Sequence, residues 1–487
     1  MATKNSNFSK IILLTSYILF SICIISLSSN IVNSNSNNEN WILQYVIVSL
    51  IQISMSIIYI KKSGEELFSL SIVFIILTYI FNFGQLFMYA FKIKNNSDYD
   101  VVGWIPLEIL NKACMFTSVS ITFITLGIII VWAKNKKMNI ICDDIINKIN
   151  LKNTFRTGLV LFCIGILPKF YIEFSKLQLH STGGYLDTYE VLSFNGGGVL
   201  STFANMSEYG ICMLLIGLQE KKKVCKLLFL SSLFFEIITM FSGNRARATM
   251  SILMYLYIYV KLIKKISMKD IIIFLFYGYI GLSFLTFISR IRMQFNVNFA
   301  TLLNDFTYSF FQHSPIFDAL AEFGSTMLTL CYSILIFPQY GKPTYGTNYL
   351  FSLLNAIPNI NGILEGFRNS FEYTNLFKLY FKHPMALGGS FLGELYYNFN
   401  YLGPFFAIVI GFIVGYVSKN INYSIKRKDW IRLSIFMILF PNILWLVRNY
   451  FSSIPRDFIW TSMVILIISF FVKKEKKLLY SVTHKME

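Results

Sequence analysis

Long hydrophobic runs recur along the whole chain and are separated by short polar segments. Each run has about 18 to 22 residues, enough for a helix to cross a hydrocarbon core of roughly 30 Å. The runs are continuous rather than alternating, which predicts α-helices and not the strands of a membrane barrel. The pattern predicts twelve spans, at residues of about 10–29, 41–60, 67–91, 113–133, 156–176, 199–218, 224–241, 246–263, 270–289, 401–418, 430–450 and 457–472.

The composition agrees with this pattern. Of the 487 residues, 55% are hydrophobic and only 14% are charged, and the mean hydropathy is +0.57. A soluble protein of this length would carry about 25% charged residues. We therefore expect an all-α polytopic integral membrane protein with one membrane domain and no soluble domain at either end. The first span follows Lys4 and Lys10 without an A-x-A cleavage pattern, so we expect a retained signal anchor.

The distribution of basic residues predicts the orientation of the spans. With the N-terminus inside, 28 of the 43 Lys and Arg residues lie in cytoplasmic segments, as the positive-inside rule requires. Every inner loop is then basic, and both termini are cytoplasmic. The predicted order is nine spans over 10–289, an outer loop over 290–400, three spans over 401–472 and a cytoplasmic tail over 473–487.

Arginine is concentrated on the predicted outer side. The inner cations comprise 25 Lys and three Arg, whereas the 14 outer cations comprise seven of each. Topology requires only positive charge, so the outer arginines point to planar, bidentate binding of phosphate or carboxylate. The alternative is that these arginines cap helix C-termini or extend to lipid headgroups.

Six of these arginines lie at predicted outer turns. Arg245 and Arg247 begin one span just after Asn244, Arg290 and Arg292 end the next outward span, and Arg448 and Arg456 flank the turn NYFSSIPRD. Arginines two residues apart on a helix diverge by about 200°, but at a helix end both can turn to one ligand. The three turns could thus converge on one anion at the membrane surface, where the charge of a polyprenyl diphosphate lies.

The long outer loop contains one distinctive apolar piece, residues 316–338. A thirteenth span there would invert the charge pattern that follows. We therefore expect a helix on the membrane surface or against the bundle, with Asp318 and Glu322 facing water. The rest of the loop, and the outer loop 177–198 with Asp187 and Glu190, are rich in aromatic, amide or Gly residues that suit contacts with sugars.

Cysteine and histidine give no sign of a metal site. The seven Cys include no C-x-x-C pair and the four His show no ligand spacing, so we expect neither a metal nor a cofactor.

The segment HPMALGGSFLGELYYNFNYLGPFFAIVIGFIVG, residues 383–415, resembles the last periplasmic stretch of the O-antigen polysaccharide polymerase (Wzy) family. In that family a small-residue Ser-Phe step precedes an acidic residue, an aromatic-Asn-Phe step and a Gly before a span. The corresponding residues are Gly388, Gly389, Ser390, Phe391, Glu394, Tyr397, Asn398, Phe399 and Gly403. The SGNRAR turn, the number of spans and the late outer loop are also similar to that family.

The resemblance implies a membrane glycosyltransferase of the GT-C type in the bacterial cytoplasmic membrane. It would transfer a growing O-antigen, capsular or exopolysaccharide chain from polyprenyl diphosphate to another lipid-linked repeat unit, on the outer face. Its partners would be these lipid-linked oligosaccharides, membrane lipid, and a chain-length regulator and flippase of the same pathway, with no nucleic acid.

The chemistry of this reaction suggests roles for the outer residues. A diphosphate leaving group develops negative charge, for which arginine is a plausible substitute for a metal. Candidates for a base are Glu394, Asp187, Glu190 and His383, and Glu394 has the best context. Its alternative role is that of an acid favoured by a helix N-terminus. We assign catalysis to Glu394, Arg245, Arg247 and Arg290, and substrate binding to Arg292, Arg448, Arg456, Asn244, Tyr397, Asn398, Asp187 and His383.

Two other functions share this architecture. A lipid-linked oligosaccharide flippase would place ionisable residues at mid-membrane depth, and Lys169, Glu173, Glu208 and Glu236 lie there. Lys169 with Glu173 or Glu208 is more simply interpreted as an internal pair that stabilises the bundle. An O-antigen ligase would use the same arginine chemistry, and the sequence barely separates it from a polymerase.

Overall fold

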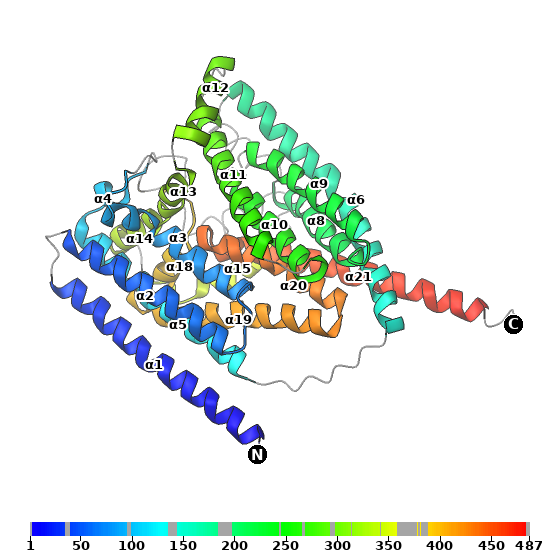
Figure 1. Ribbon diagram of the computed structural model, residues 1–487, viewed down its shortest axis with the longest axis horizontal. Coiled ribbons are helices and arrows are strands. Elements are labelled where there is room, and N and C mark those ends of the chain that lie inside the picture. The colour runs from blue at the N-terminus through cyan, green and yellow to red at the C-terminus, as the bar shows by residue number, and fades with distance from the viewer. Residues whose placement is uncertain are drawn as a thin grey trace.

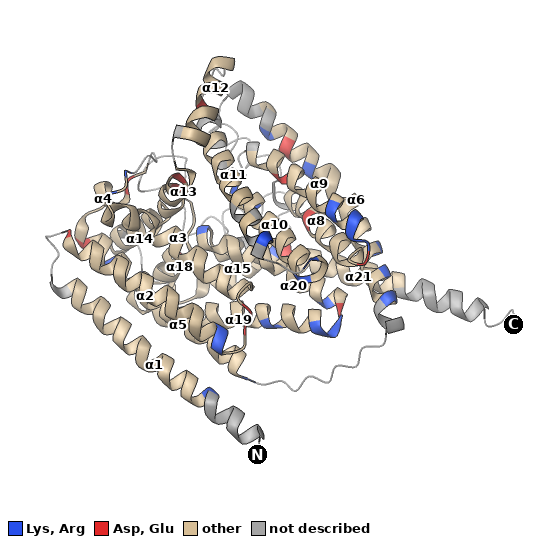
Figure 2. Cartoon of the chain, viewed as in Figure 1, with Lys and Arg blue, Asp and Glu red and all other residues tan. Residues whose placement is uncertain are grey.

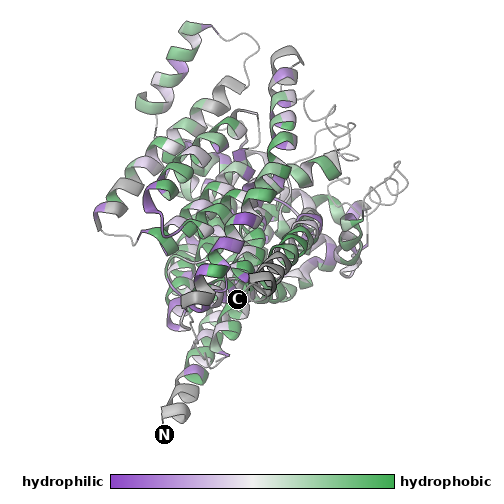
Figure 3. Ribbon diagram, turned by 90° about the vertical axis from the view of Figure 1, so that its right-hand side faces the viewer, coloured by the Kyte–Doolittle hydropathy of each residue, from purple (hydrophilic) through white to green (hydrophobic). Residues whose placement is uncertain are grey.

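The structure is a computed structural model that describes residues 2–34, 39–94, 99–134, 144–183, 197–242, 245–264, 268–292, 298–312, 314–340, 342–357, 377, 380 and 388–483. Within these residues the regular structure is helical throughout. Figure 1 shows α1 along one edge of the bundle and α6 along the opposite edge, with α10 and α20 between them. Figure 3 shows that hydrophobic positions cover most of the bundle.

The first half of the chain forms α1 (Ala2–Ser34), α2 (Asn40–Lys62), α3 (Leu70–Ala90), α4 (Val101–Trp104), α5 (Leu107–Ala133), α6 (Asp144–Gly183), α8 (Gly197–Gly217), α9 (Lys222–Phe241), α10 (Arg245–Ile258) and the π-helical turn η1 (Tyr259–Ile263).

The second half forms α11 (Met268–Arg292), α12 (Phe299–Thr307), the π-helical turn η2 (Tyr308–Gln312), α13 (Pro315–Gly324), α14 (Met327–Tyr340), α15 (Thr347–Leu353), η3 (Leu354–Ala356), α18 (Phe391–Phe399), η5 (Asn400–Leu402), α19 (Gly403–Arg427), α20 (Trp430–Trp445), η6 (Leu446–Arg448), η7 (Phe451–Ser453) and α21 (Ile454–Thr483).

Eleven helical segments in the described part of the chain are long and apolar enough to cross a membrane. Ten of them coincide with predicted spans, which confirms the polytopic helical class. The predicted spans at 224–241 and 270–289 form the helices α9 and α11, but these are not among the eleven. The eleventh is Pro315–Gln339, within the segment that the sequence assigned to the outer loop.

This segment differs from the single helix that the sequence predicts. It forms two helices, α13 and α14, which break at Ser325 and Thr326. They pack against α3, α11, α5 and α18, which agrees with the prediction of a segment lying against the bundle. The expectation that Glu322 faces water holds only in part, because its side chain is 27% exposed while its carboxylate pairs with Arg245 of α10. That partner is distant in sequence, so the local pattern could not reveal it.

Small residues allow the closest approaches between helices. A Cβ atom at Gly411 of α19 would lie 2.1 Å from the carbonyl oxygen of Ile124 on α5. At Gly165 of α6 it would lie 2.3 Å from the backbone nitrogen of Ser207 on α8. Helices surrounded by lipid gain little from hydrophobic association with one another, so such backbone contact supplies much of their packing energy.

We predict from the charge pattern that position 342 is outside and position 426 is cytoplasmic. Both side chains are exposed, so each can report its side of the membrane. In an otherwise cysteine-free protein, an impermeant thiol reagent applied to intact cells should label Lys342→Cys and spare Lys426→Cys. Labelling of Lys426→Cys with protection of Lys342→Cys would reverse the topology, and permeabilised cells provide the control for reactivity.

Candidate functional site

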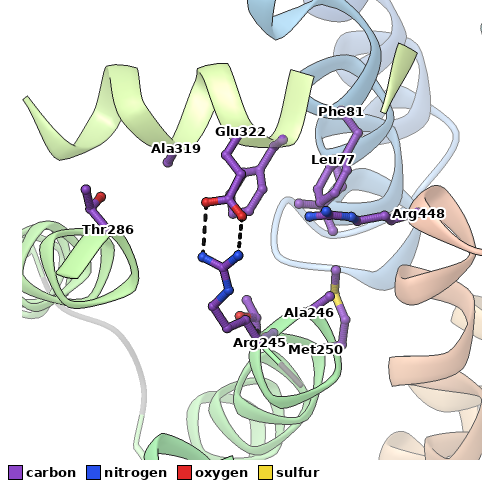
Figure 4. Close-up of a pocket in the computed structure, with 11 residues that line it drawn as sticks. Leu77, Phe81, Arg245, Ala246, Met250, Thr286, Ala319, Glu322 and Arg448 are labelled. Atoms are coloured by element: carbon purple, nitrogen blue, oxygen red, sulfur yellow. Dashed lines mark hydrogen bonds and ion pairs between the residues drawn. The ribbon is translucent and has the colours of Figure 1, made fainter. Parts of the chain in front are cut away.

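A pocket with mostly apolar walls lies where five separate parts of the chain meet (Figure 4). The pocket is small, with a cavity volume of about 50 Å³, and it opens to solvent. Its walls come from α3, α10, α11, α13 and η6, through Leu77, Phe81, Arg245, Ala246, Thr249, Met250, Thr286, Ala319, Glu322, Phe323 and Arg448. In the predicted topology Arg245 and Arg448 lie at the outer ends of their spans.

Arg245 and Glu322 form a two-pronged ion pair across this pocket. The Arg245 guanidinium places Nη2 2.6 Å from Glu322 Oε1, and Nη1 donates to Oε2 at 3.1 Å. Figure 4 shows the two parallel contacts. Both side chains keep partial contact with solvent, since 12% of Arg245 and 27% of Glu322 is exposed. The pair therefore shows the geometry in which a guanidinium holds an oxyanion.

Arg448 lines the same pocket from η6, at the end of α20 (Figure 4). It pairs with no carboxylate in the part of the chain that the structure describes. The pocket thus brings together two guanidinium groups and one carboxylate. The sequence predicted that Arg245 and Arg448 converge, and their shared pocket is consistent with that prediction.

Arg247 does not share this pocket. Helix α10 begins at Arg245, so the side chains of Arg245 and Arg247 diverge as helical geometry requires. Arg247 is 8% exposed and points into the bundle. There it donates to Glu208 Oε2 at 3.3 Å, to Asn442 Oδ1 at 2.7 Å and to the Tyr209 hydroxyl at 2.8 Å. Its Nη2 lies 3.6 Å from Asp457 Oδ2.

Further buried charges surround Glu208 of α8, and Figure 2 shows acidic and basic positions on α6, α8 and α9. Lys169 Nζ donates to Glu208 Oε1 at 2.9 Å and to Glu236 Oε1 at 3.3 Å, and all three residues are buried. This confirms the interpretation of Lys169 and Glu208 as an internal pair. Glu173 instead pairs with Lys176 and accepts a hydrogen bond from Ser242. These contacts join α6, α8 and α9 to α10.

Glu394 lies near the start of α18 and is only 1% exposed. Its Oε2 accepts the backbone N–H of Phe451 at 2.9 Å, and its Oε1 accepts from Asn348 Nδ2 at 3.5 Å. It therefore connects α18 to α15 and to the turn between α20 and α21. Asn398, one helical turn later, accepts from Thr344 Oγ1 at 2.7 Å.

Other predicted residues hold the chain around this turn. Arg456 Nε donates to the carbonyl oxygen of Asn355 in η3 at 2.7 Å. Tyr397 packs edge-on against Phe337 of α14. Arg290 and Arg292 lie in the last turn of α11, but the structure does not describe their side chains. Asn244, Asp187, Glu190 and His383 lie outside the described residues.

Sequence reasoning did not assign a site role to Glu322. The sequence shows only that Glu322 is an acidic residue within an apolar segment, and such a residue is also expected on a surface that faces water. The pairing with Arg245 joins positions separated by 77 residues.

The helices and the pocket together define a multi-pass membrane protein with an arginine-lined cavity between its helices. The profile of the family described as O-antigen polysaccharide polymerase Wzy matches residues 11–477, nearly the whole chain. The chain belongs to this family, and it polymerises lipid-linked O-antigen repeat units. No curated protein and no solved structure matches the chain.

The buried contacts of Arg247 lead to a stability prediction. Arg247→Ala would remove the cation that pairs with Asp457 and one partner of Glu208. Breaking a buried ion pair in this way costs about 3–5 kcal/mol. We expect a lower unfolding temperature in detergent and a lower abundance in the membrane. The exposed Arg427→Ala serves as the control, and wild-type stability of Arg247→Ala would show that the network does not support the fold.

Proposed function

We propose that the chain transfers a growing glycan from polyprenyl diphosphate to the end sugar of another lipid-linked repeat unit. The reaction takes place on the outer face of the bacterial cytoplasmic membrane and uses arginine in place of a metal ion. The product is O-antigen or a related capsular or exopolysaccharide. One observation carries this proposal: Arg245 and Arg448 line one pocket with otherwise mostly apolar walls.

The pocket has the two properties that such a donor requires. Its apolar residues on α3, α10 and α13 suit the prenyl chain next to the headgroup. Its guanidinium groups suit phosphate oxygens, because their planar donors form paired hydrogen bonds. The contact between Arg245 and Glu322 demonstrates this two-pronged geometry at Arg245.

The bonds that form and break in this reaction suggest a role for Arg245 and Arg448. A hydroxyl oxygen of the acceptor sugar attacks the anomeric carbon of the donor, and the bond from that carbon to the diphosphate oxygen breaks. The bonding electrons leave with the diphosphate, where Arg245 and Arg448 stabilise the developing charge. The hydroxyl proton passes to a base or to water. Arg290 and Arg292, at the end of the neighbouring α11, are proposed as further partners of the diphosphate.

For Glu394 we propose a positioning role beside the acceptor rather than direct proton transfer. Its burial and its bonds to Phe451 and Asn348 support this role. The carboxylate would hold the turn 449–453, which leads back to Arg448. The region around this turn also includes Tyr397, Asn398 and Arg456, which we propose as substrate-binding residues. Further candidates for contact with sugar are Asp187 and His383.

Conservative substitution of the pocket arginines tests the diphosphate site. Arg245→Lys and Arg448→Lys each retain the positive charge but lose the two-pronged contact. Loss of one such contact to a developing anion costs on the order of 3 kcal/mol, or about a hundredfold in rate. We expect shorter O-antigen chains in a complemented deletion strain, with normal membrane abundance of the protein.

Arg427→Lys is the matched control, because Arg427 is exposed at the predicted cytoplasmic end of α19 and should tolerate Lys. Full-length polymer from both pocket variants would refute the diphosphate site. The deletion strain itself separates the activities. Single repeat units on the lipid core identify a polymerase, whereas unattached long chains identify a ligase and inward-facing lipid-linked units a flippase.

Glu394→Gln distinguishes positioning from proton transfer. Glutamine keeps an acceptor oxygen for the Phe451 N–H but cannot act as a base at neutral pH. We therefore expect Glu394→Gln to retain most polymerisation, and Glu394→Ala to lose it. Polymer length on gels and protein abundance are the two measurements. Complete loss with Glu394→Gln at normal abundance would instead identify Glu394 as the base.

A further inference from the structure

The charges of the pocket bear on which anions it accepts. Two guanidinium groups, Arg245 and Arg448, line the pocket with one carboxylate, Glu322, so among the described residues one positive charge is left without a carboxylate partner. The carboxylate holds Arg245 through both of its oxygens. A phosphate that binds Arg245 must therefore compete with Glu322 for the same donors.

Glu322 is held close to this position by its helix. Gln85 of α3 donates Nε2 to the carbonyl oxygen of Ala321, next to Glu322, at 2.7 Å. A Cβ atom at Gly324 would lie 2.4 Å from the backbone nitrogen of Gln85, so α13 lies directly on α3. The backbone of Glu322 thus stays beside the pocket while its partly exposed side chain can turn to water. A tethered competitor of this kind acts at high effective concentration.

We propose that Glu322 is a specificity-determining residue that makes the pocket select a diphosphate over a lipid with one phosphodiester. This inference rests on the proposed function, because it takes the Arg245–Arg448 pocket as the diphosphate site. A sugar-linked prenyl diphosphate carries one negative charge on each of two phosphates. Phosphatidylglycerol carries one negative charge and surrounds any site at the membrane surface in large excess.

The competition favours the donor for electrostatic reasons. The donor can pair with both arginines, so it offsets the loss of the contact between Arg245 and Glu322. A phosphodiester can pair with Arg448 alone and leave Glu322 in place, or it can displace Glu322 and leave Arg448 uncompensated. Either outcome provides fewer charge-assisted bonds than the donor makes. Without Glu322, the same two arginines would attract bulk anionic lipid.

Binding to the full-length protein in nanodiscs tests this proposal. The probe is fluorescent farnesyl diphosphate carrying one N-acetylglucosamine, and the discs contain phosphatidylcholine with or without phosphatidylglycerol. For the wild-type protein we expect phosphatidylglycerol to change the Kd of the probe by less than about twofold. For Glu322→Gln we expect tighter probe binding in phosphatidylcholine, and a loss of about tenfold when phosphatidylglycerol is added.

Glu108→Gln is the matched control, because it removes a carboxylate that pairs with Lys112 at the start of α5, outside the pocket. An unchanged response to phosphatidylglycerol in Glu322→Gln would overturn the proposal. Strong competition by phosphatidylglycerol in the wild-type protein would also overturn it, and this measurement needs no variant to fold. Glu322→Asp keeps the charge and should remain selective.

The arginine variants separate this inference from the proposed function. If Arg245→Lys and Arg448→Lys bind the probe as the wild type does, the pocket is not the diphosphate site and both proposals fail. If they weaken binding while Glu322→Gln behaves as the wild type, the diphosphate site stands and only the role of Glu322 is refuted.

Discussion

The scarcity of water inside a membrane bundle is the constraint on which this structure depends. A charge buried there is costly unless another group pairs with it and satisfies its hydrogen bonds. Arg247, Lys169, Glu208, Glu236 and Asp457 meet this requirement together, in a network that connects α6, α8, α9, α10 and α21. Through Arg247 the network attaches the start of α10 to α8 and α21. Arg245 lies two residues earlier on the same helix and lines the pocket.

The charges of Arg245 and Glu322 in the pocket are also paired, but their weaker burial makes an unpaired charge less costly there. Arg245 and Glu322 remain partly exposed, so their bond can be exchanged for another oxyanion at lower cost than a fully buried pair. The buried network and the pocket pair lie at the two sides of one turn of α10. The side chains of Arg245 and Arg247 have similar access to water, at 12% and 9% exposed, so the two pairs differ mainly in the exposure of Glu322, at 27%, compared with Glu208, at 2%.

Much of the fold could be predicted from the sequence, because the length of an apolar run is a local property. Ten helical spans follow from that property alone, and the basic residues beside them are read directly from the sequence. The break between α13 and α14 could not be predicted, since their packing against α3 and α18 depends on distant residues. For the site, the sequence indicated Arg245 and Arg448 through their residue type. It could not place Arg247 in the interior or find Glu322, because Glu208, Asp457 and Arg245 are partners brought together only by folding.

The spacing of Arg245 and Arg247 has a consequence for substitutions in this chain. Only Ala246 separates the two positions on α10, yet each side chain contacts a different set of distant residues. Loss of Arg247 leaves Glu208 and Asp457 with one partner fewer, whereas loss of Arg245 leaves Glu322 with one partner fewer. The interior position is thereby tied to the architecture of the bundle. The pocket position depends on Glu322 and, in the proposed function, on the diphosphate, so two arginines of one short motif are constrained by different partners.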